Sequence, residues 1–233
     1  MYYRLSNTAG MKEIERNFDS TFDFPKLYET QHVINGLKES SIPVITMQKP
    51  SSIQFAIWGV LPEGYTGEWQ IFQDNFNTLN INYNQLKKTV WCCNMLETRR
   101  CIIIANGIFC SRLFDGELYP YYVTAKNQEA FGMAGVYNVL EDGFITASFL
   151  TSPLTPEMKR IQHIGDHMPH IMSAEDAKNW IDPSNSETDV EILAHLPVSL
   201  ALNYHPIAKE FFDQNITYKS GLEPVIYRSI PKA

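Results

Sequence analysis

The densest group of residues able to do chemistry lies in the segment H-I-G-D-H-M-P-H, which holds His163, Asp166, His167 and His170. Two histidines four residues apart bind zinc when a helix presents both imidazoles on one face. Gly165 and Pro169 interrupt any helix here, and the segment lacks the glutamate of a zinc-protease motif. We therefore interpret these histidines as residues of a loop and predict no metal site.

Four cysteines offer a second route to chemistry: Cys92, Cys93, Cys101 and Cys110. No two of them form a C-x-x-C pair, so their spacing does not indicate a thiolate zinc site. A nucleophilic cysteine also needs a neighbouring base and a lowered pKa, and the sequence places neither beside these residues. We expect reduced cysteines that pack as small apolar side chains, Cys92 and Cys93 from a helix, and we predict no cofactor.

A third candidate is the amide-rich stretch N-T-L-N-I-N-Y-N-Q, residues 77–85. Asparagine and glutamine side chains hydrogen-bond to nucleic-acid bases and phosphates. The same residues also form Asx-turns, in which the side chain bonds the nearby backbone. The turn interpretation is preferred unless other parts of the chain bring this stretch into a site.

The composition is that of a globular protein, with 44% apolar residues among 233. Acidic side chains outnumber basic ones by 26 to 19, which gives a formal net charge of −7. This charge opposes bulk attraction to nucleic acid or to an anionic membrane. The chain shows neither a signal-peptide pattern nor the ~18 apolar residues that a membrane span needs, so we expect no membrane association and a cytoplasmic location. No linker interrupts it, and we predict one domain over residues 1–233.

Periodicity and turn residues predict the elements that must position these groups. Helical patterns cover residues 11–18, 86–100 and 173–181, and the last begins with Ser173 as its N-cap. A further helix is expected in the final third of the chain. Strands separated by Gly and Asp-Gly turns are predicted at 42–47, 52–62, 101–109, 119–125, 131–140 and 144–152. Strands in hairpin-like succession, with helices gathered elsewhere, indicate an α+β fold with a largely antiparallel sheet.

Several blocks, in order, resemble the SRAP family of abasic-site processing proteins. F-A-I-W-G-V-L-P resembles the family's W-G-L-[VI]-P, and L-N-I-N-Y-N-Q stands where the family has I-N-A-R-x-E. E-T-R-R-C-I-I-I-A-N-G-I-F resembles R-R-C-L-[VI]-P-A-x-G-[FY]-[YF], and A-F-G-M-A-G-V-Y-N resembles [FA]-A-G-L-[WY]-[ED]. I-G-D-H-M-P resembles I-H-D-R-M-P, and S-A-E-D-A-K-N-W-I resembles P-E-D-W-x-x-W-L. The likeness is clearest over residues 1–181.

The resemblance implies both a fold and an unusual reaction. The fold would be a mostly antiparallel, curved, barrel-like sheet flanked by helices. Family members begin M-C-G-R, and loss of methionine exposes a cysteine whose amine condenses with the aldehyde of an abasic site in single-stranded DNA. The thiolate then closes a thiazolidine ring and leaves a stable protein–DNA crosslink. An asparagine, a glutamate and a histidine position the sugar and move protons.

This chain departs from the family at three of those four positions. Tyr2 replaces the crosslinking cysteine, Cys110 replaces the glutamate, and Gly165 replaces the histidine, whereas Asn80 is retained. A phenol cannot close a thiazolidine ring, because the ring needs a sulfur on the β-carbon. Since methionine aminopeptidases generally require a small second residue, we also expect Met1 to be retained. The resemblance therefore predicts a degenerate crosslinking centre.

In the family a basic groove with an aromatic or apolar wedge holds the single strand. The residues that correspond to DNA-binding positions here are Arg4, Trp58, Asn80 and His167, the last in place of an arginine. For Trp58, a core aromatic beside the site is an equal alternative. Asn82 stands where another family arginine would lie, so a phosphate contact is expected to be missing. Arg99 and Arg100 match the family's R-R, and a role in packing is an alternative for both.

These observations leave three hypotheses. The first is an SRAP-fold protein of the DNA-damage response that binds single-stranded or abasic DNA weakly and forms no crosslink. The second is a structural or regulatory paralogue that binds a protein partner and no nucleic acid, which the net charge favours. The third is an enzyme with a peptidase-type self-processing activity, and it ranks last because the first two residues offer no thiol.

Overall fold

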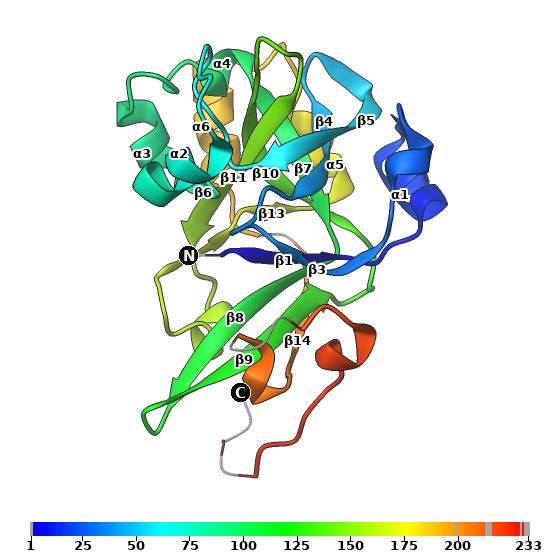
Figure 1. Ribbon diagram of the computed structural model, residues 1–233, viewed down its shortest axis with the longest axis vertical. Helices are drawn as coiled ribbons and strands as arrows, with labels where there is room; N and C mark the ends of the chain where they lie inside the picture. The colour runs from blue at the N-terminus through cyan, green and yellow to red at the C-terminus, as the bar shows by residue number, and fades with distance from the viewer. Residues whose placement is uncertain (1, 199, 213–215, 229, 231–233) are drawn as a thin grey trace.

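A computed structural model describes residues 2–198, 200–212, 216–228 and 230. Met1, for which the sequence predicts retention, lies outside the described residues. The chain forms two sheets that follow one another along the long axis of the molecule, with the larger sheet at the top of Figure 1 and the smaller one below it. No helix among the described residues is long and apolar enough to span a membrane.

The larger sheet is mostly antiparallel and strongly curled. Its strand order is β12-β11-β10-β7-β4-β5-β2, and β13 and β6 join it beside β10 and β11. It curls far enough that β11 pairs with β10 on one side and, in parallel, with β5 on the other. The strands are β2 (Thr21–Phe22), β4 (Ser41–Thr46), β5 (Lys49–Trp58), β6 (Asn80–Asn82), β7 (Arg100–Ala105), β10 (Phe131–Val139), β11 (Ile145–Pro153), β12 (His167–Pro169) and β13 (Ile171–Met172).

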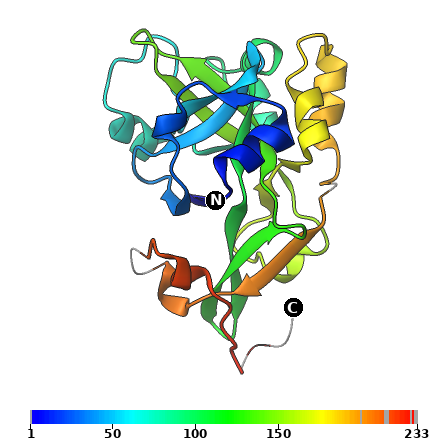
Figure 2. The ribbon, with the colours of Figure 1, turned by 90° about the vertical axis from the view of Figure 1, so that its right-hand side faces the viewer.

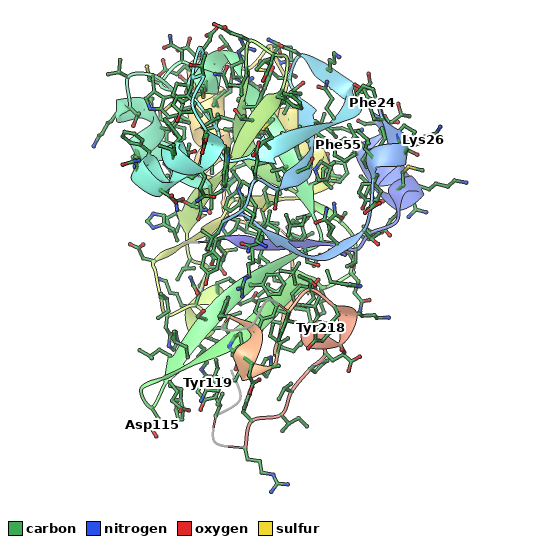
Figure 3. The ribbon with its side chains drawn as sticks, in the orientation of Figure 1. Phe24, Lys26, Phe55, Asp115, Tyr119 and Tyr218 are labelled. Carbon is green, nitrogen blue, oxygen red and sulfur yellow. The ribbon has the colours of Figure 1, made fainter. Side chains whose placement is uncertain are left out.

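The smaller sheet has the order β14-β9-β8-β1-β3 and is antiparallel throughout. Its strands are β1 (Arg4–Asn7), β3 (Gln31–Asn35), β8 (Gly107–Phe114), β9 (Glu117–Ala125) and β14 (Leu202–Pro206). The β8–β9 hairpin turns at Asp115 and Gly116, whose φ angles of +49° and +75° suit the tight turn expected for Asp-Gly. Asp115 lies at the tip of this hairpin, at the lower end of the molecule in Figure 3.

Helices cover the larger sheet. α1 (Met11–Phe18) and α5 (Ala174–Trp180) lie side by side against it, as Figure 2 shows for the blue and yellow helices. Ser173 caps α5 by accepting a hydrogen bond from the Asp176 backbone N–H, as its sequence predicts. The further helices are α2 (Trp69–Phe76), α3 (Tyr83–Lys88), α4 (Met95–Thr98) and α6 (Glu187–His195), with 3₁₀ turns at Pro25–Leu27, Met158–Arg160, Lys209–Phe211 and Lys219–Leu222. The α+β class is therefore confirmed.

Two predicted elements are wrong in their extent. No continuous helix forms over residues 86–100. Turns separate α3 from α4, because the side of the predicted helix that carries Val90 does not pack against the core. Val90 is 90% exposed and so cannot anchor a helix to the core. The strand predicted over residues 101–109 is two strands in different sheets, because the chain leaves the larger sheet at Asn106, whose backbone N–H donates to the Ser6 carbonyl of β1.

Strand β7 shows how the sequence builds the core. All six of its residues are buried, since β10 and β4 flank it and both faces are covered. Cys101 and Ile103 face one apolar cluster, whereas Ile102 and Ile104 face the other. This alternation follows from the period of two in a strand, and it explains why the run is continuously apolar.

Candidate functional site

The N-terminal strand brings residue 2 to the junction of the two sheets. β1 pairs with β3 through Leu5 and Ile34, and with β8 through Leu5 and Ile108. This pairing brings the start of the chain alongside β8, where the Tyr2 side chain reaches Cys110. The Tyr2 side chain is only 3% exposed, so it is a buried residue and not a loose end of the chain.

Asn80 holds the backbone of Tyr2 with both ends of its amide. The Tyr2 backbone N–H donates to Asn80 Oδ1 over 2.7 Å, and Asn80 Nδ2 donates to the Tyr2 carbonyl over 2.5 Å. Asn80 lies on β6, which pairs in parallel with β11 at Phe149. Two residues 78 apart in the sequence therefore meet in one site, as the resemblance requires. The Asn80 amide is occupied by the protein's own backbone.

The side chains of Tyr2 and Cys110 meet in the same buried place. The Tyr2 hydroxyl lies 3.8 Å from Cys110 Sγ. Burial raises the pKa of the Cys110 thiol to about 12, although the hydrogen bond from Tyr2 acts in the opposite direction. Burial and the nearby sulfur also hold the pKa of the Tyr2 phenol well above its usual range. Both groups are consequently neutral at physiological pH, and neither acts as a base or a nucleophile there.

This environment leads to a prediction about thiol reactivity. All four cysteines are free, and only Cys93 is partly exposed, in the turn that joins α3 to α4. Iodoacetamide at pH 8 should label Cys93 in the folded protein and leave Cys110 unmodified, because only a thiolate reacts and burial keeps Cys110 protonated. Peptide mass spectrometry at successive times measures this. In denaturant all four should be labelled, and early labelling of Cys110 in the folded chain would contradict the buried site.

The substituted histidine position is open space. A Cβ built on Gly165 meets no atom closer than Gln162 Nε2, at 3.9 Å. Two residues on, His167 Nδ1 lies 2.6 Å from Asp166 Oδ1, and this contact is the main cause that lowers the pKa of the Asp166 carboxyl. His163 contacts the Leu113 carbonyl instead, over 3.0 Å. Within the described part of the chain, no three metal-binding side chains gather into a possible metal site.

Arg4 is engaged by the C-terminal segment. Its guanidinium donates to the carbonyls of Phe211 and Phe212 over 2.6 and 3.3 Å. It also lies over the rings of Tyr3, Phe211 and Phe212, with 4.9–5.5 Å from Cζ to the ring centroids. These contacts use part of the guanidinium, so fewer of its N–H donors are available to a DNA phosphate. Arg4 therefore binds the C-terminal segment to the start of the chain, a role that its neighbours in the sequence do not indicate.

Trp58 is part of the core and not of the surface. Its side chain has no exposed area, and its Nε1 donates to the Leu79 carbonyl over 2.9 Å. Gly36 lies directly against the indole, where even a Cβ would come within 2.7 Å of the ring. A side chain without exposed area offers no surface to a DNA strand, so the alternative of a core aromatic describes Trp58. By fixing Leu79, it helps to position Asn80.

The amide-rich stretch divides between the two interpretations. Asn82 caps α3, and its side chain accepts a hydrogen bond from the Asn84 backbone N–H over 3.0 Å. This is the Asx-turn interpretation. Asn80, two residues earlier, is the one member of the stretch that joins the site. Asn80 and Asn82 leave β6 on the same side, since Ile81 between them is buried on the other. Their roles differ because Asn82 is also the N-cap of α3.

A pocket of about 160 Å³ opens next to Tyr2. It is formed by residues that no sequence pattern brings together: Tyr2, Tyr3, Arg4, Phe109, Cys110, Ser111, Leu118, Gln162, Ile164 and Phe212. Gln162 ties the loop before Gly165 to strand β8, since its Oε1 accepts from the Ser111 backbone N–H over 3.1 Å. Sequence analysis missed Gln162 because neither its neighbours nor its spacing distinguish it from a surface glutamine.

Comparison with known sequences places this site in context. A family model described as SOS response associated peptidase (SRAP) matches residues 1–213. The abasic site processing protein YobE of Bacillus subtilis (strain 168) is 26% identical over 136 residues, which are 57% of this chain and 59% of YobE. YoaM of the same organism, with the same descriptive name, is 22% identical over 192 residues, or 80% and 81% of the two chains. HMCES of Xenopus tropicalis, also named an abasic site processing protein, is 22% identical and matched over 51% of its length.

Solved structures share the fold. A protein from Bacteroides thetaiotaomicron superposes with a TM-score of 0.84 at 20% sequence identity, covering 96% of this chain and all of that one. A protein from Bordetella bronchiseptica superposes with a TM-score of 0.73 at 16% identity, covering 88% of this chain and 99% of the other. At these identities the likeness establishes the architecture and nothing more specific.

Proposed function

This chain belongs to the SRAP family, and from that premise we propose that it binds single-stranded or abasic DNA without crosslinking to it. The observation that supports this most directly is the place of Tyr2. Its ring is buried against Cys110, and Asn80 hydrogen-bonds both sides of its backbone. The residue that the reaction would need as a nucleophile is here a packed phenol.

The atoms at positions 2, 110 and 165 explain why this chain should form no crosslink. Thiazolidine formation needs an amine and a thiol on the same residue, and Tyr2 carries no sulfur. The Cys110 thiol lies on a different residue, and burial keeps it protonated. Neither Cys110 nor Gly165 supplies the carboxylate or imidazole that would move protons in the condensation. An aldehyde that enters the site therefore has no route to a stable five-membered ring.

The covalent part of the proposal is tested with an abasic oligonucleotide. The purified protein is incubated with single-stranded DNA that holds one abasic site and is then run on a denaturing gel. We expect no shifted band, and Tyr2→Phe should leave the result unchanged, because the hydroxyl performs no step. A stable band whose formation is the same in both proteins would contradict the proposal, since it would show a crosslinking nucleophile at another position.

The binding part is tested at low salt by fluorescence anisotropy with a labelled single-stranded oligonucleotide. We expect weak, saturable binding that falls as salt rises, with a log–log slope of ~0.7 for each phosphate contact. The slope should be small, because Asn82 replaces one family arginine and Arg4 already binds backbone carbonyls. Absence of binding below physiological salt would contradict DNA binding by this protein.

A second candidate function is supported by the same charges. The net charge of −7 and the engaged Arg4 both favour a member that binds a protein partner and no nucleic acid. The anisotropy titration separates the two candidates, since only the first predicts a saturable signal with DNA. In both, the SRAP scaffold is kept and the crosslinking reaction is absent.

A further inference from the structure

We propose that an apolar surface of the larger sheet, formed by Phe24, Leu27 and Phe144 around a groove, is the interface through which two copies of this chain form a two-fold dimer. The groove shares no residue with the pocket beside Tyr2, so the proposal does not depend on DNA binding. Figure 3 shows Phe24 and Phe55, which both line the groove, at the upper right of the molecule, away from the junction of the sheets where β1 runs in Figure 1.

The groove opens where two strands share one edge of β5. β2 pairs with this edge at Ser52 and Ile53, and β11 pairs with it over Ala56–Trp58. Neither strand pairs with Phe55, which lies between them, and the groove here has a volume of about 650 Å³. Its lining includes several half-buried apolar side chains: Phe55, Ile57 and Ile145. The exposed side chains of the apolar surface stand around this lining.

The exposed side chains stand on backbone that the protein already holds in place. Phe24 and Leu27 flank the 3₁₀ turn, where the Leu27 backbone N–H donates to the Phe24 carbonyl over 3.0 Å. The Phe144 backbone N–H donates to Asp142 Oδ1 over 3.1 Å, and the Phe144 carbonyl accepts from the Leu140 N–H over 2.9 Å. Little conformational freedom of the backbone remains to be lost on association. Contiguous apolar side chains on ordered backbone are typical of a protein interface.

The size of the apolar surface suits a contact with a second copy. Phe24, Leu27 and Phe144 are 61%, 66% and 61% exposed. Large apolar side chains have roughly 200 Å² each, so these three offer about 350 Å². A two-fold contact covers the surface of both copies, or about 700 Å². Specific interfaces bury at least ~1,200 Å², of which about 60% is apolar, so this surface supplies the apolar share of a small dimer interface.

The charges on this surface favour a second copy over a partner of one sign. Lys26 lies between Phe24 and Leu27 in the sequence and beside Phe24 in Figure 3, and Glu39 lines the groove. Neither charge forms an ion pair with any residue that the structure describes. A strongly basic or strongly acidic partner would place like charge against one of them. A second copy presents both signs, as a self-complementary interface requires.

Sedimentation velocity of the natural protein tests the proposal, over concentrations from about 1 to 500 μM. We expect a reversible monomer–dimer equilibrium with a Kd of about 1–50 μM, as for a small interface. Phe24→Ala and Phe144→Ala should each weaken the dimer by at least about tenfold, because two-fold symmetry removes the side chain twice. Phe76→Ala is the matched control. Phe76 is 70% exposed on α2 and lies outside the groove, so its loss should change the Kd by no more than about twofold. Thermal unfolding shows that each variant is folded.

Three results would overturn the dimer interface. The first is a natural protein that stays monomeric over the whole concentration range, whatever other partner binds this surface. The second is a dimer that both folded variants, Phe24→Ala and Phe144→Ala, keep unchanged, because the interface would then lie elsewhere. The third is equal weakening by Phe76→Ala, which would show association through any exposed apolar side chain. The anisotropy titration tests DNA binding separately, so failure of one proposal leaves the other standing.

Discussion

Replacing Tyr2 with cysteine, Cys110 with glutamate and Gly165 with histidine in one chain should produce a protein that crosslinks to abasic single-stranded DNA. The three changes restore the family's residues around the retained Asn80, whose amide already lies on the backbone of residue 2. The measurement is a band that survives a denaturing gel and is absent for the natural chain. Intact mass must show that Met1 is removed, so that the new cysteine has a free amine.

The structure explains why the changes belong together. A glutamate at position 110 alone would be buried against the Tyr2 ring, where an unpaired carboxylate is costly. Tyr2→Cys removes that ring and leaves room for the longer side chain. Histidine at 165 has room, because the nearest atom to its Cβ is 3.9 Å away, but the φ angle of +159° at Gly165 means that the backbone of this loop must adjust to accept a side chain. Each substitution therefore relieves a constraint on another or uses space that is already open.

Variants that carry only some of the three substitutions show how much each group contributes to the rate of crosslinking. Tyr2→Cys alone should react more slowly than the triple variant by ~10²–10⁴-fold, the usual contribution of positioned acid–base groups. The triple variant with serine in place of the new cysteine is the matched control and should give no stable band, because an oxygen ring of this kind reopens readily. If the triple variant carries a free N-terminal cysteine, is folded and still forms no adduct, the assignment of positions 2, 110 and 165 is wrong.

Arg100→Met should lower the free energy of unfolding by about 3–5 kcal/mol, the largest stability loss that we expect from a single charged residue here. The Arg100 side chain is 1% exposed, and its guanidinium donates over 2.6–2.7 Å to the carbonyls of Leu96, Trp180 and Asp182. It thereby joins the ends of α4 and α5. Methionine fills similar volume but leaves these carbonyls without their donor.

The neighbouring arginine provides the control. Arg99 is partly exposed, and its guanidinium lies over the Tyr137 ring with 5.7 Å from Cζ to the ring centroid. Arg99→Met should therefore cost no more than about 1 kcal/mol. Thermal and urea unfolding of both variants measure the difference, and Arg100→Met should unfold about 10 °C lower than the natural chain. Equal effects from the two substitutions would contradict the structural role of Arg100.

The local patterns of the sequence predict most of the helices and strands. They do not predict the positions at which a helix or strand is interrupted. Helix 11–18 is correct because Ile14 and Phe18 repeat on one face, and both are buried. The strands at 119–125 and 131–140 are predicted because alternation or continuous apolar character is a local property. The break at Asn106 is not local, since it depends on a hydrogen bond to Ser6 on another strand.

The sequence predicted which residues lie in the site more successfully than it predicted what each of them does there. The sequence brings Tyr2 and Asn80 together through the family resemblance, and the structure places them in contact. It does not separate a phosphate-binding Arg4 from one that holds Phe211, because the two residues are 207 apart in the sequence. It likewise leaves Trp58 between core and surface until the burial of the indole decides the matter.

The sequence by itself determined which reactive atoms exist: residue 2 has no sulfur, residue 110 no carboxylate and residue 165 no imidazole. These are covalent facts that folding does not change. Only the tertiary structure decided which groups are free to act, because burial and hydrogen-bond partners come from segments distant in the chain. Cys110 is kept as a neutral thiol by its surroundings, and the Arg4 guanidinium is held by the carbonyls of Phe211 and Phe212.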